Sequence, residues 1–402
     1  MEDIFPTKKE EQHLKSIVDN FSKKLKDKEV NFLVGGSYAK GTWLKGKPDI
    51  DIFARFNYEK YNDKDISKEL KKLLRKKKIN SETIHGSRDY FQTKIEGFVF
   101  EIIPVLDIKK SNKSKNVTDV SPLHVRYIKK HATEKIKNDI RLLKKLCKSH
   151  DLYGAESYIK GFSGYVLEVL TVHYGSLKKL INAVKKWDEK EIIDPARHYD
   201  SKKDVLSELN RSKKESPLIL IDPVQKERNL AAALSNRKYG ELIKLANTYD
   251  GSKEFFVKKE VNPDKLKGYT VFKIKPLDKK IDIAGAKLLK ALEKTKKAAE
   301  REGLKVKDYG WKWEDEHAYF WFKTNKLEKI KKHYGPQTKQ KSNLENFKKK
   351  WKGKRIYKEK GKVYIKIKRT KTTSKDVLQE ILKNQDIKNN FLYQKLYKQS
   401  KN

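Results

Sequence analysis

The sequence contains a single cysteine, Cys147, among its 402 residues. A lone cysteine excludes an intrachain disulfide and fits a reducing compartment, where it is more often structural than catalytic. Cysteine and histidine nowhere have the spacing of a zinc site, so we expect no zinc. Residues 1–17 lack the apolar core of a signal peptide, and no apolar run approaches the roughly 20 residues of a membrane helix. We therefore expect a cytoplasmic protein with no membrane partner.

Acidic residues are scarce relative to basic ones, with 54 Asp and Glu against 96 Lys and Arg and a net charge of +42. Such a surplus attracts polyanions, and nucleic acid is the leading partner because neutralising its phosphates releases counterions. A lysine-rich solvated surface is the alternative, and charge alone separates neither these two nor RNA from DNA. Hydrophobic residues still make up 37% of the chain, enough for a folded core. Its length suggests about two to three domains.

Hydrophobic periodicity divides the chain into residues 1–115, 116–250 and 251–402 and predicts a multidomain α+β protein. The first region mixes helices and strands. Helices are expected at 10–28 and 65–78, and strands are expected at 30–37, 49–56 and 97–108. The middle region is expected to be helical, with helices at 134–150, at 161–187 (or two helices joined near Gly175) and at 228–249.

Strands return in the third region. Expected strands at 268–277 and 316–324 flank a helix at 283–303, which suggests a small α+β unit. A hairpin is expected over 354–371, with its turn at Lys360-Gly361. Alternation puts apolar side chains on one face (Val363, Ile365, Ile367) and polar ones on the other (Tyr364, Lys366, Lys368). A face of tyrosine and lysine suits RNA backbone contacts and base stacking, although an ordinary solvated sheet face has the same composition.

Two aspartates, Asp49 and Asp51, lie one residue apart in the stretch LVGGSYAKGTWLKGKPDIDIF (residues 33–53). Strand side chains alternate, so both carboxylates face one side while Ile50 and Ile52 face the core. Two like charges on one face repel unless a cation lies between them, and Mg²⁺ prefers oxygen ligands and substrate phosphates. Two such ions can activate an attacking hydroxyl and stabilise the leaving oxygen of a phosphoryl displacement.

Glu101 is the expected third carboxylate of this site. It is the sole charged residue between Phe98 and Val105 in a strongly apolar strand, and a buried carboxylate requires a metal or a partner. A structural salt bridge is the alternative for Glu101, and a solvated strand end is the alternative for the two aspartates.

The glycines before the aspartates suit a phosphate-binding turn. Gly35-Gly36-Ser37 would let backbone N–H groups and the serine hydroxyl approach phosphates closely, with Lys40 as an added cation. The turn alone is a weak signal, because many turns contain the same residues. Its combination with the two aspartates and a later isolated carboxylate is much stronger.

The stretch GGSYAKGTWLKGKPDIDIF resembles the signature of the nucleotidyltransferase superfamily that includes DNA polymerase beta. More narrowly, the chain resembles the archaeal-type (class I) CCA-adding enzymes, the tRNA nucleotidyltransferases that build the 3′ CCA end. Further motifs follow in the family's order along nearly the whole chain: SPLHVRY, KSHDLYGAES, KGFSGYVLEVLTVHYGS, IDPVQKERNLAAALS and HYGPQTK. The middle motifs are the specific ones, because the superfamily at large lacks them.

The resemblance implies a polymerase-beta-like nucleotidyltransferase head (1–115), a helical nucleotide-recognition neck (116–250) and an α+β tRNA-binding body and tail (251–402). It also implies that the catalytic, metal-binding residues are Asp49, Asp51 and Glu101, with Mg²⁺ as the cofactor. The family often has Glu at the first position and usually Asp at the third. These exchanges keep the charge and move the oxygens by one methylene.

Residues that bind the nucleotide phosphates are implied by the same motifs. Ser37 and Lys40 match the triphosphate contacts, although the family often has the bidentate Arg in place of this lysine. Lys148 matches the phosphate lysine that precedes the YGAE motif. Ser157 stands where some members have a tyrosine, and Tyr158 follows it.

Contacts to the nucleoside are implied as well. Ser121 and His124 match the T-P-x-H motif, whose hydroxyl and imidazole lie near phosphate and ribose. Arg228 matches the arginine that reads the base edge of CTP or ATP. Without the resemblance, His124 would be an ordinary surface histidine and Arg228 a salt bridge at a helix start.

The implied reaction is template-free extension of an RNA 3′ end. The tRNA 3′ hydroxyl attacks the α-phosphate of CTP or ATP and pyrophosphate leaves. The partners are tRNA, CTP and ATP, and the sequence leaves the oligomeric state open, a homodimer included. One alternative is another superfamily enzyme, such as an oligoadenylate or cyclic-dinucleotide synthase. The other is a non-catalytic tRNA-binding protein, against which the three retained carboxylates argue.

Overall fold

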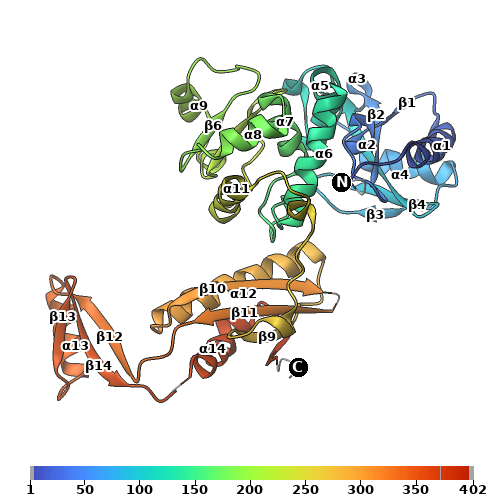
Figure 1. Cartoon of the computed structure of the whole chain (residues 1–402). Helices are drawn as coiled ribbons and strands as arrows, with labels where there is room; N and C mark the ends of the chain where they lie inside the picture. Colours follow the sequence, from blue (N-terminus) through green and yellow to red (C-terminus); the bar gives the residue numbers. More distant parts are fainter. Residues whose placement is uncertain (1–3, 315, 372, 398–402) are drawn as a thin grey trace. The chain divides into compact units, whose positions relative to one another are not determined.

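The computed structural model describes residues 4–314, 316–371 and 373–397 of the chain. The chain divides into two compact units, Met1–Lys259 and Glu260–Asn402 (Figure 1). Within the first unit, one hydrophobic cluster lies around the N-terminal sheet and another lies among the helices that follow. The finer predicted boundaries after residues 115 and 250 stay predictions.

The N-terminal sheet has the strand order β1-β2-β5-β4-β3. Its strands β2 and β5 are parallel, and the other neighbours are antiparallel. The elements are α1 (Lys8–Leu25), β1 (Val30–Val34), α2 (Gly36–Lys40), β2 (Ile50–Asn57), α3 (Tyr58–Tyr61), α4 (Ile66–Lys76), β3 (Glu82–Ile84), β4 (Tyr90–Ile95) and β5 (Phe98–Asp107). Both helices and all three strands predicted for this region are confirmed.

Amphipathic faces bring α1 and α4 onto this sheet. The apolar residues of α1 that recur at helical spacing are buried against the sheet core, as are Leu70 and Leu74 of α4. The alternation in β2 is also as predicted, because Ile50 and Ile52 are fully buried. The sheet thereby presents the alternate side chains of β2, Asp51 among them, to its other side.

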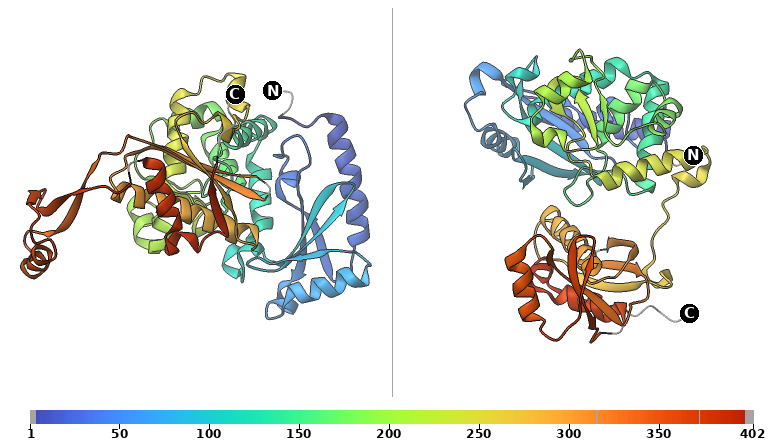
Figure 2. Two further views of the ribbon diagram at one scale, coloured as in Figure 1. Left: turned by 90° about the horizontal axis from the view of Figure 1, so that it is seen from below. Right: turned by 90° about the vertical axis from the view of Figure 1, so that its left-hand side faces the viewer.

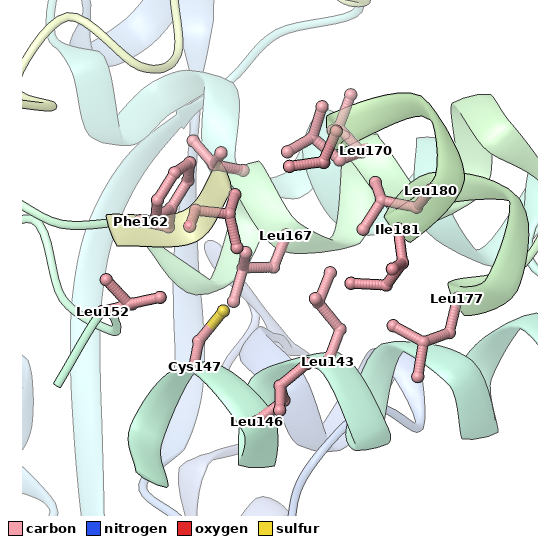
Figure 3. Close-up of a cluster of buried hydrophobic side chains, with 14 of the residues drawn as sticks. Leu143, Leu146, Cys147, Leu152, Phe162, Leu167, Leu170, Leu177, Leu180 and Ile181 are labelled. Carbon is pink, nitrogen blue, oxygen red and sulfur yellow. The ribbon is translucent and has the colours of Figure 1, made fainter. Parts of the chain in front are cut away.

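Helices dominate the rest of the first unit: α5 (Ser121–His131), α6 (Glu134–Ser149), α7 (Gly164–Tyr174), α8 (Leu177–Val184), α9 (Lys202–Glu208), α10 (Arg211–Lys214) and α11 (Asn236–Thr248). Figure 3 shows leucines of α6 packing against those of α7 and α8 around Cys147. Burial raises the pKa of the Cys147 thiol to about 12, so this cysteine is structural. Gly175 has a φ of +78° and ends α7, which makes the predicted long helix two helices.

The expectation of an all-helical middle region is wrong in one part. A small sheet with the order β6-β7-β8 lies there, formed by Glu191–Ile193, Leu218–Asp222 and Gln225–Asn229. The fully buried run of β7 has no periodicity that distinguishes a strand from a helix.

The predicted helix 228–249 begins late, at Asn236. The side chain of Asn229 accepts hydrogen bonds from the backbone N–H groups of Leu220 and Ala231 and holds the chain in a turn. Ser235 then caps α11 by accepting from the N–H of Lys238. The apolar run after Arg228 therefore packs as a turn, although its composition favours a helix.

The second unit contains two sheets. The first has the order β10-β11-β9-β15 and packs against α12 and α14, and the second has the order β12-β14-β13 and packs against α13. The elements are β9 (Thr270–Lys275), α12 (Ile281–Arg301), β10 (Val306–Glu314), β11 (His317–Thr324), β12 (Ile330–Gln337), α13 (Lys341–Lys350), β13 (Ile356–Glu359), β14 (Lys362–Lys368), α14 (Ser374–Lys383), α15 (Gln385–Lys388) and β15 (Tyr393–Leu396). Figure 2 shows two further views of both units.

The predicted strands, helix and hairpin of this unit are confirmed, with the hairpin turn at Lys360 and Gly361. Val363 and Ile365 are buried, as their shared face predicts, but Tyr364 is also buried, with 9% of its surface exposed. The reason is that Tyr364 lies between two other tyrosine rings, Tyr357 at 5.2 Å and Tyr334 at 5.5 Å. In the part of the chain that the structure describes, no helix is long and apolar enough to cross a membrane.

Candidate active site

Asp51 and Glu101 lie side by side on the neighbouring parallel strands β2 and β5. Burial raises the pKa of Asp51 to about 6, with Lys40 opposing the rise and Asp49 adding to it. Burial raises the pKa of Glu101 to about 7, and the charges of Asp51 and Asp49 add to that rise. Asp49 is exposed and precedes β2 by one residue. The charge of Asp49 therefore opposes the ionisation of Asp51, and the charges of Asp49 and Asp51 both oppose the ionisation of Glu101.

The predicted glycine turn lies directly against Asp51. The N–H of Gly35 donates to the backbone oxygen of Asp51 at 2.7 Å. Gly36 has a φ of +60°, and a Cβ on it would lie 1.6 Å from Oδ2 of Asp51. Only glycine can therefore occupy this position without moving the carboxylate. Ser37 follows in the first turn of α2, where backbone N–H groups are available for an anion.

Divalent cations fit the chemistry of this donor set. Its donors are hard carboxylate oxygens, and burial raises the pKa values of Asp51 and Glu101 because Lys40 and Gln92 offset only part of the cost of burying these two charges. Within residues 4–314, 316–371 and 373–397, no three acidic, histidine or cysteine side chains meet closely enough to hold a metal ion.

Two predicted phosphate lysines lie near these carboxylates. The ammonium group of Lys40 is buried and lies 2.5 Å from Oε2 of Glu168, so its direct contact with a nucleotide stays a prediction. Lys148 lies over the ring of Tyr153, at 4.8 Å from its centroid. Burial lowers the pKa of Lys148, and the charge of Asp49 opposes this effect.

His124 and Arg228 meet at another acidic residue, Asp222, the last residue of β7. Nε2 of His124 lies 2.8 Å from Oδ2 of Asp222, and Nη1 of Arg228 lies 3.8 Å from the same oxygen. His124 is buried beneath Tyr165, so it is not the surface histidine of the alternative reading. Among the described residues, neither Nη1 of Arg228 nor the hydroxyl of Tyr165 has a hydrogen-bond partner, although both atoms are buried.

The remaining predicted residues lie on the same unit. Ser121 is the first residue of α5, one turn before His124. Ser157 is exposed on the loop between α6 and α7. Their contacts with a nucleotide stay predictions.

Sequence reasoning missed two buried carboxylates, Glu168 and Asp222, and the buried Lys144. Glu168 is the sole charged residue in the apolar run from Gly164 to Val172, and Asp222 ends the apolar run LILID. An isolated charge in an apolar segment was the signal that found Glu101, and it would have found Glu168 and Asp222 as well.

Three family models match successive parts of the chain. Residues 1–136 match the Second Messenger Oligonucleotide or Dinucleotide Synthetase domain. Residues 138–257 match the tRNA nucleotidyltransferase second domain, and residues 271–391 match the CCA-adding enzyme C-terminal domain. The CCA-adding enzyme of Nanoarchaeum equitans is 38% identical over 75% of this chain and 76% of its own length.

The chain belongs to the archaeal-type CCA-adding enzymes. A second relative, the CCA-adding enzyme of Sulfolobus acidocaldarius, is 30% identical over 77% of this chain and 72% of its own length. Membership confirms the predicted family, the tRNA nucleotidyltransferase class and the multidomain α+β fold. Among solved structures, the Cid1 poly(U) polymerase with bound Mg and 3′-dATP has a TM-score of 0.49 at 13% identity, covering 64% of this chain and 96% of its own. That likeness is too distant to assign a function.

Proposed function

We propose that this CCA-adding enzyme extends the 3′ end of tRNA with C, C and A, at a site formed by Asp49, Asp51 and Glu101. The pairing of Asp51 with Glu101 on the neighbouring strands β2 and β5, beside the Gly36 turn, carries the proposal. The 3′ oxygen of the tRNA forms a bond to the α-phosphorus of CTP or ATP. The bond between the α- and β-phosphates breaks, the hydroxyl proton leaves to solvent, and pyrophosphate departs.

Mg²⁺ is the proposed cofactor, which Asp51 and Glu101, with Asp49 beside them, would hold together with the triphosphate; it would supply positive charge that lowers the pKa of the attacking hydroxyl and stabilises the leaving pyrophosphate. The chain's own contribution is to hold Asp51 against Gly36 and to keep Glu101 beside it on β5. Positioning of this kind accounts for most of the catalysis of phosphoryl transfer.

Phosphate positioning falls to Ser37, Lys148 and the N–H groups that begin α2. The proposed role of Lys148 is supported by the charge of Asp49, which acts on its ammonium group. Lys40 and Lys144 together exceed the charge of Glu168 by one, so this buried group adds positive potential beneath the turn. We assign Lys40 this role through space.

Arg228 is the proposed base-reading residue. His124 and Ser121 are proposed to contact the ribose and phosphate of the same nucleotide. Asp222 orients Arg228, and the buried Nη1 of Arg228 is a donor for the polar edge of cytosine or adenine. A donor that is satisfied only by the correct base discriminates strongly, because a wrong base leaves it buried and unpaired.

The second unit is the proposed holder of the tRNA. On the sheet β12-β14-β13, Lys332 and Lys366 lie over tyrosine rings and Tyr334 is exposed, so this sheet offers both cations and an aromatic ring to RNA. A cytoplasmic location, to which the one buried thiol is suited, and assembly as a homodimer complete the proposal.

The decisive test uses purified protein, Mg²⁺ and transcribed tRNAs that end before CCA, after C and after CC. Each tRNA is offered CTP, ATP or both, beside an Asp49→Ala/Asp51→Ala variant as control. Addition of C, C and A, lost in the variant, is expected. If A is added only to the CC-ending tRNA and no C is added to the others, the enzyme is specialised for adding the terminal A.

Reactions without tRNA test the rival suggested by the match of residues 1–136 to a synthetase domain. We expect no product in them. Nucleotide oligomers made without tRNA would overturn the proposal in favour of a synthase. Tight tRNA binding with no incorporation would favour a binding protein.

A further inference from the structure

Glu168 is a fully buried carboxylate near the proposed site, with 0% of its surface exposed. Its Oε2 accepts from the ammonium group of Lys40 at 2.5 Å. Its Oε1 accepts from the hydroxyl of Thr42 at 2.6 Å and from the ammonium group of Lys144 at 2.7 Å. The cost of removing this charge from water is thus offset by two cations and a hydroxyl.

The four residues come from two parts of the first unit. Lys40 and Thr42 follow the glycine turn, whereas Lys144 lies on α6 and Glu168 on α7. Lys144 also donates to the backbone oxygen of Thr42 at 3.2 Å. The cluster therefore ties the segment after the turn to the helical core.

Helix α2 depends on such an anchor. It spans only Gly36–Lys40, and a helix of five residues is not stable by itself. Its C-terminal end is fixed by the N–H of Thr42, which donates to the oxygen of Ser37 at 3.0 Å, and by the hold of Glu168 on Lys40. Its N-terminal end lies against the carboxylate of Asp51. A shift at Lys40 is therefore transmitted to Ser37 and Gly36.

We propose that Glu168 is a positioning residue for nucleotide binding, which acts by holding the Gly36–Lys40 turn at the correct distance from Asp51. This inference rests on the proposed function, because it takes the Gly36–Lys40 turn to be the part of the site that binds the nucleotide triphosphate. It adds a residue on α7 that touches no substrate. The role is exerted through Lys40 and Thr42, the two anchors of the turn.

Glu168→Gln is the first variant. The amide is of equal size and still accepts one hydrogen bond, but it leaves two ammonium groups without a counter-charge. Lys40 is then expected to leave its place and move the turn. The dissociation constants of Mg·CTP and Mg·ATP should rise about tenfold or more, and kcat/KM should fall by as much as about 100-fold. The dissociation constant for tRNA should stay within about twofold of wild type.

A matched control distinguishes a general loss of stability from a displacement of the Gly36–Lys40 turn. Leu242→Ala removes a buried side chain of α11 and lowers the melting temperature without touching the cluster. All variants are assayed where calorimetry shows them folded. We expect Leu242→Ala to bind both nucleotides like wild type. Glu168→Asp keeps the charge and should recover most of the lost affinity.

Thr42→Val covers the case in which Glu168→Gln does not fold. It keeps the volume of the side chain and removes one donor to Glu168, so nucleotide dissociation constants should rise about threefold. Wild-type dissociation constants in Glu168→Gln, or in Thr42→Val where that variant replaces it, would overturn the inference. An equal weakening in Leu242→Ala would overturn it as well. Failure of the wild type to extend tRNA would instead refute the proposed function, because nucleotide affinity is measured without tRNA.

Discussion

Gly36 and Asp51 are in such close contact that a methyl group on the glycine would lie 1.6 Å from a carboxylate oxygen. Gly36→Ala must therefore displace either the turn or the carboxylate. We expect kcat/KM for tRNA extension to fall at least about 100-fold, because a shift of about 1 Å at the reacting centre has that effect. Steady-state kinetics with a CC-ending tRNA and ATP measure it.

Gly175→Ala is the matched control for this substitution. Gly175 also has a positive φ, +78°, but nothing lies within 4 Å of its missing Cβ. It should share the backbone strain, about 1–3 kcal/mol, and keep its kcat/KM. Equal activity in the two variants would refute the contact as a requirement of the site.

The two raised carboxyl pKa values predict that metal binding stabilises the protein in a pH-dependent way. Asp51, raised to about 6, contributes stability that is fully present below its unfolded pKa and is lost as the pH rises through about 6. Glu101 does the same through about 7. Mg²⁺ binds the ionised forms, so it should raise the melting temperature clearly at about pH 8 and little at about pH 5.

Asp51→Asn sharpens this prediction. Without metal at about pH 8 the variant should be more stable than wild type, by up to about 3 kcal/mol, because a charge that burial disfavours is gone. It should also respond less to Mg²⁺. Chemical denaturation with Mg²⁺ or with EDTA provides the values. A Mg²⁺ effect equal at both pH values would contradict the assignment.

Asp222 is expected to support both base reading and the fold. Asp222→Ala leaves His124 and Arg228 without their common partner and should cost about 3–5 kcal/mol in the free energy of unfolding. With Arg228 no longer oriented, incorporation of UTP relative to CTP should rise about tenfold. Glu208→Gln, which breaks an exposed ion pair with Lys226, should change stability by less than about 0.5 kcal/mol. Unchanged selectivity in Asp222→Ala would remove Asp222 from base reading.

Tyr334 is the exposed edge of the tyrosine cluster in the second unit. Tyr334 is 49% exposed, its ring lies tilted beside that of Tyr364, and its hydroxyl donates to Glu359. Tyr334→Ala should weaken tRNA binding by about 1–3 kcal/mol, the contribution of one stacked base. Tyr334→Phe keeps the ring and should bind like wild type. Equal losses in both variants would indicate that the ring does not stack on RNA.

Lysines around this cluster predict a strong salt dependence. Lys332→Ala and Lys366→Ala remove cations that lie over the tyrosine rings. Each should lower the slope of log affinity against log salt by about 1, because one fewer counterion is released. Filter binding over a range of salt concentrations measures the slope. An unchanged slope would place the phosphate contacts elsewhere.

The sequence by itself determined elements of both units, among them α1 and β2 in the first and the hairpin of β13 and β14 in the second. The apolar stripe of α1 and the alternation in β2 are local patterns, and each is decided by a few neighbouring residues. The placement of charges was equally informative about the site. Glu101 is the sole charged residue in an apolar strand, which indicated a buried carboxylate that requires a metal or a partner. The small sheet around β7 was missed, since its buried run carries no period.

Tertiary structure alone decided which charges meet. Lys40 and Glu168 are 128 residues apart in the sequence, and His124 and Asp222 are 98 apart. No local pattern predicts these pairs, because each depends on how α7 and β7 pack against the N-terminal sheet and α5. A buried charge must find a counter-charge, but the sequence says only that one is needed. The packing of the core selects the partner.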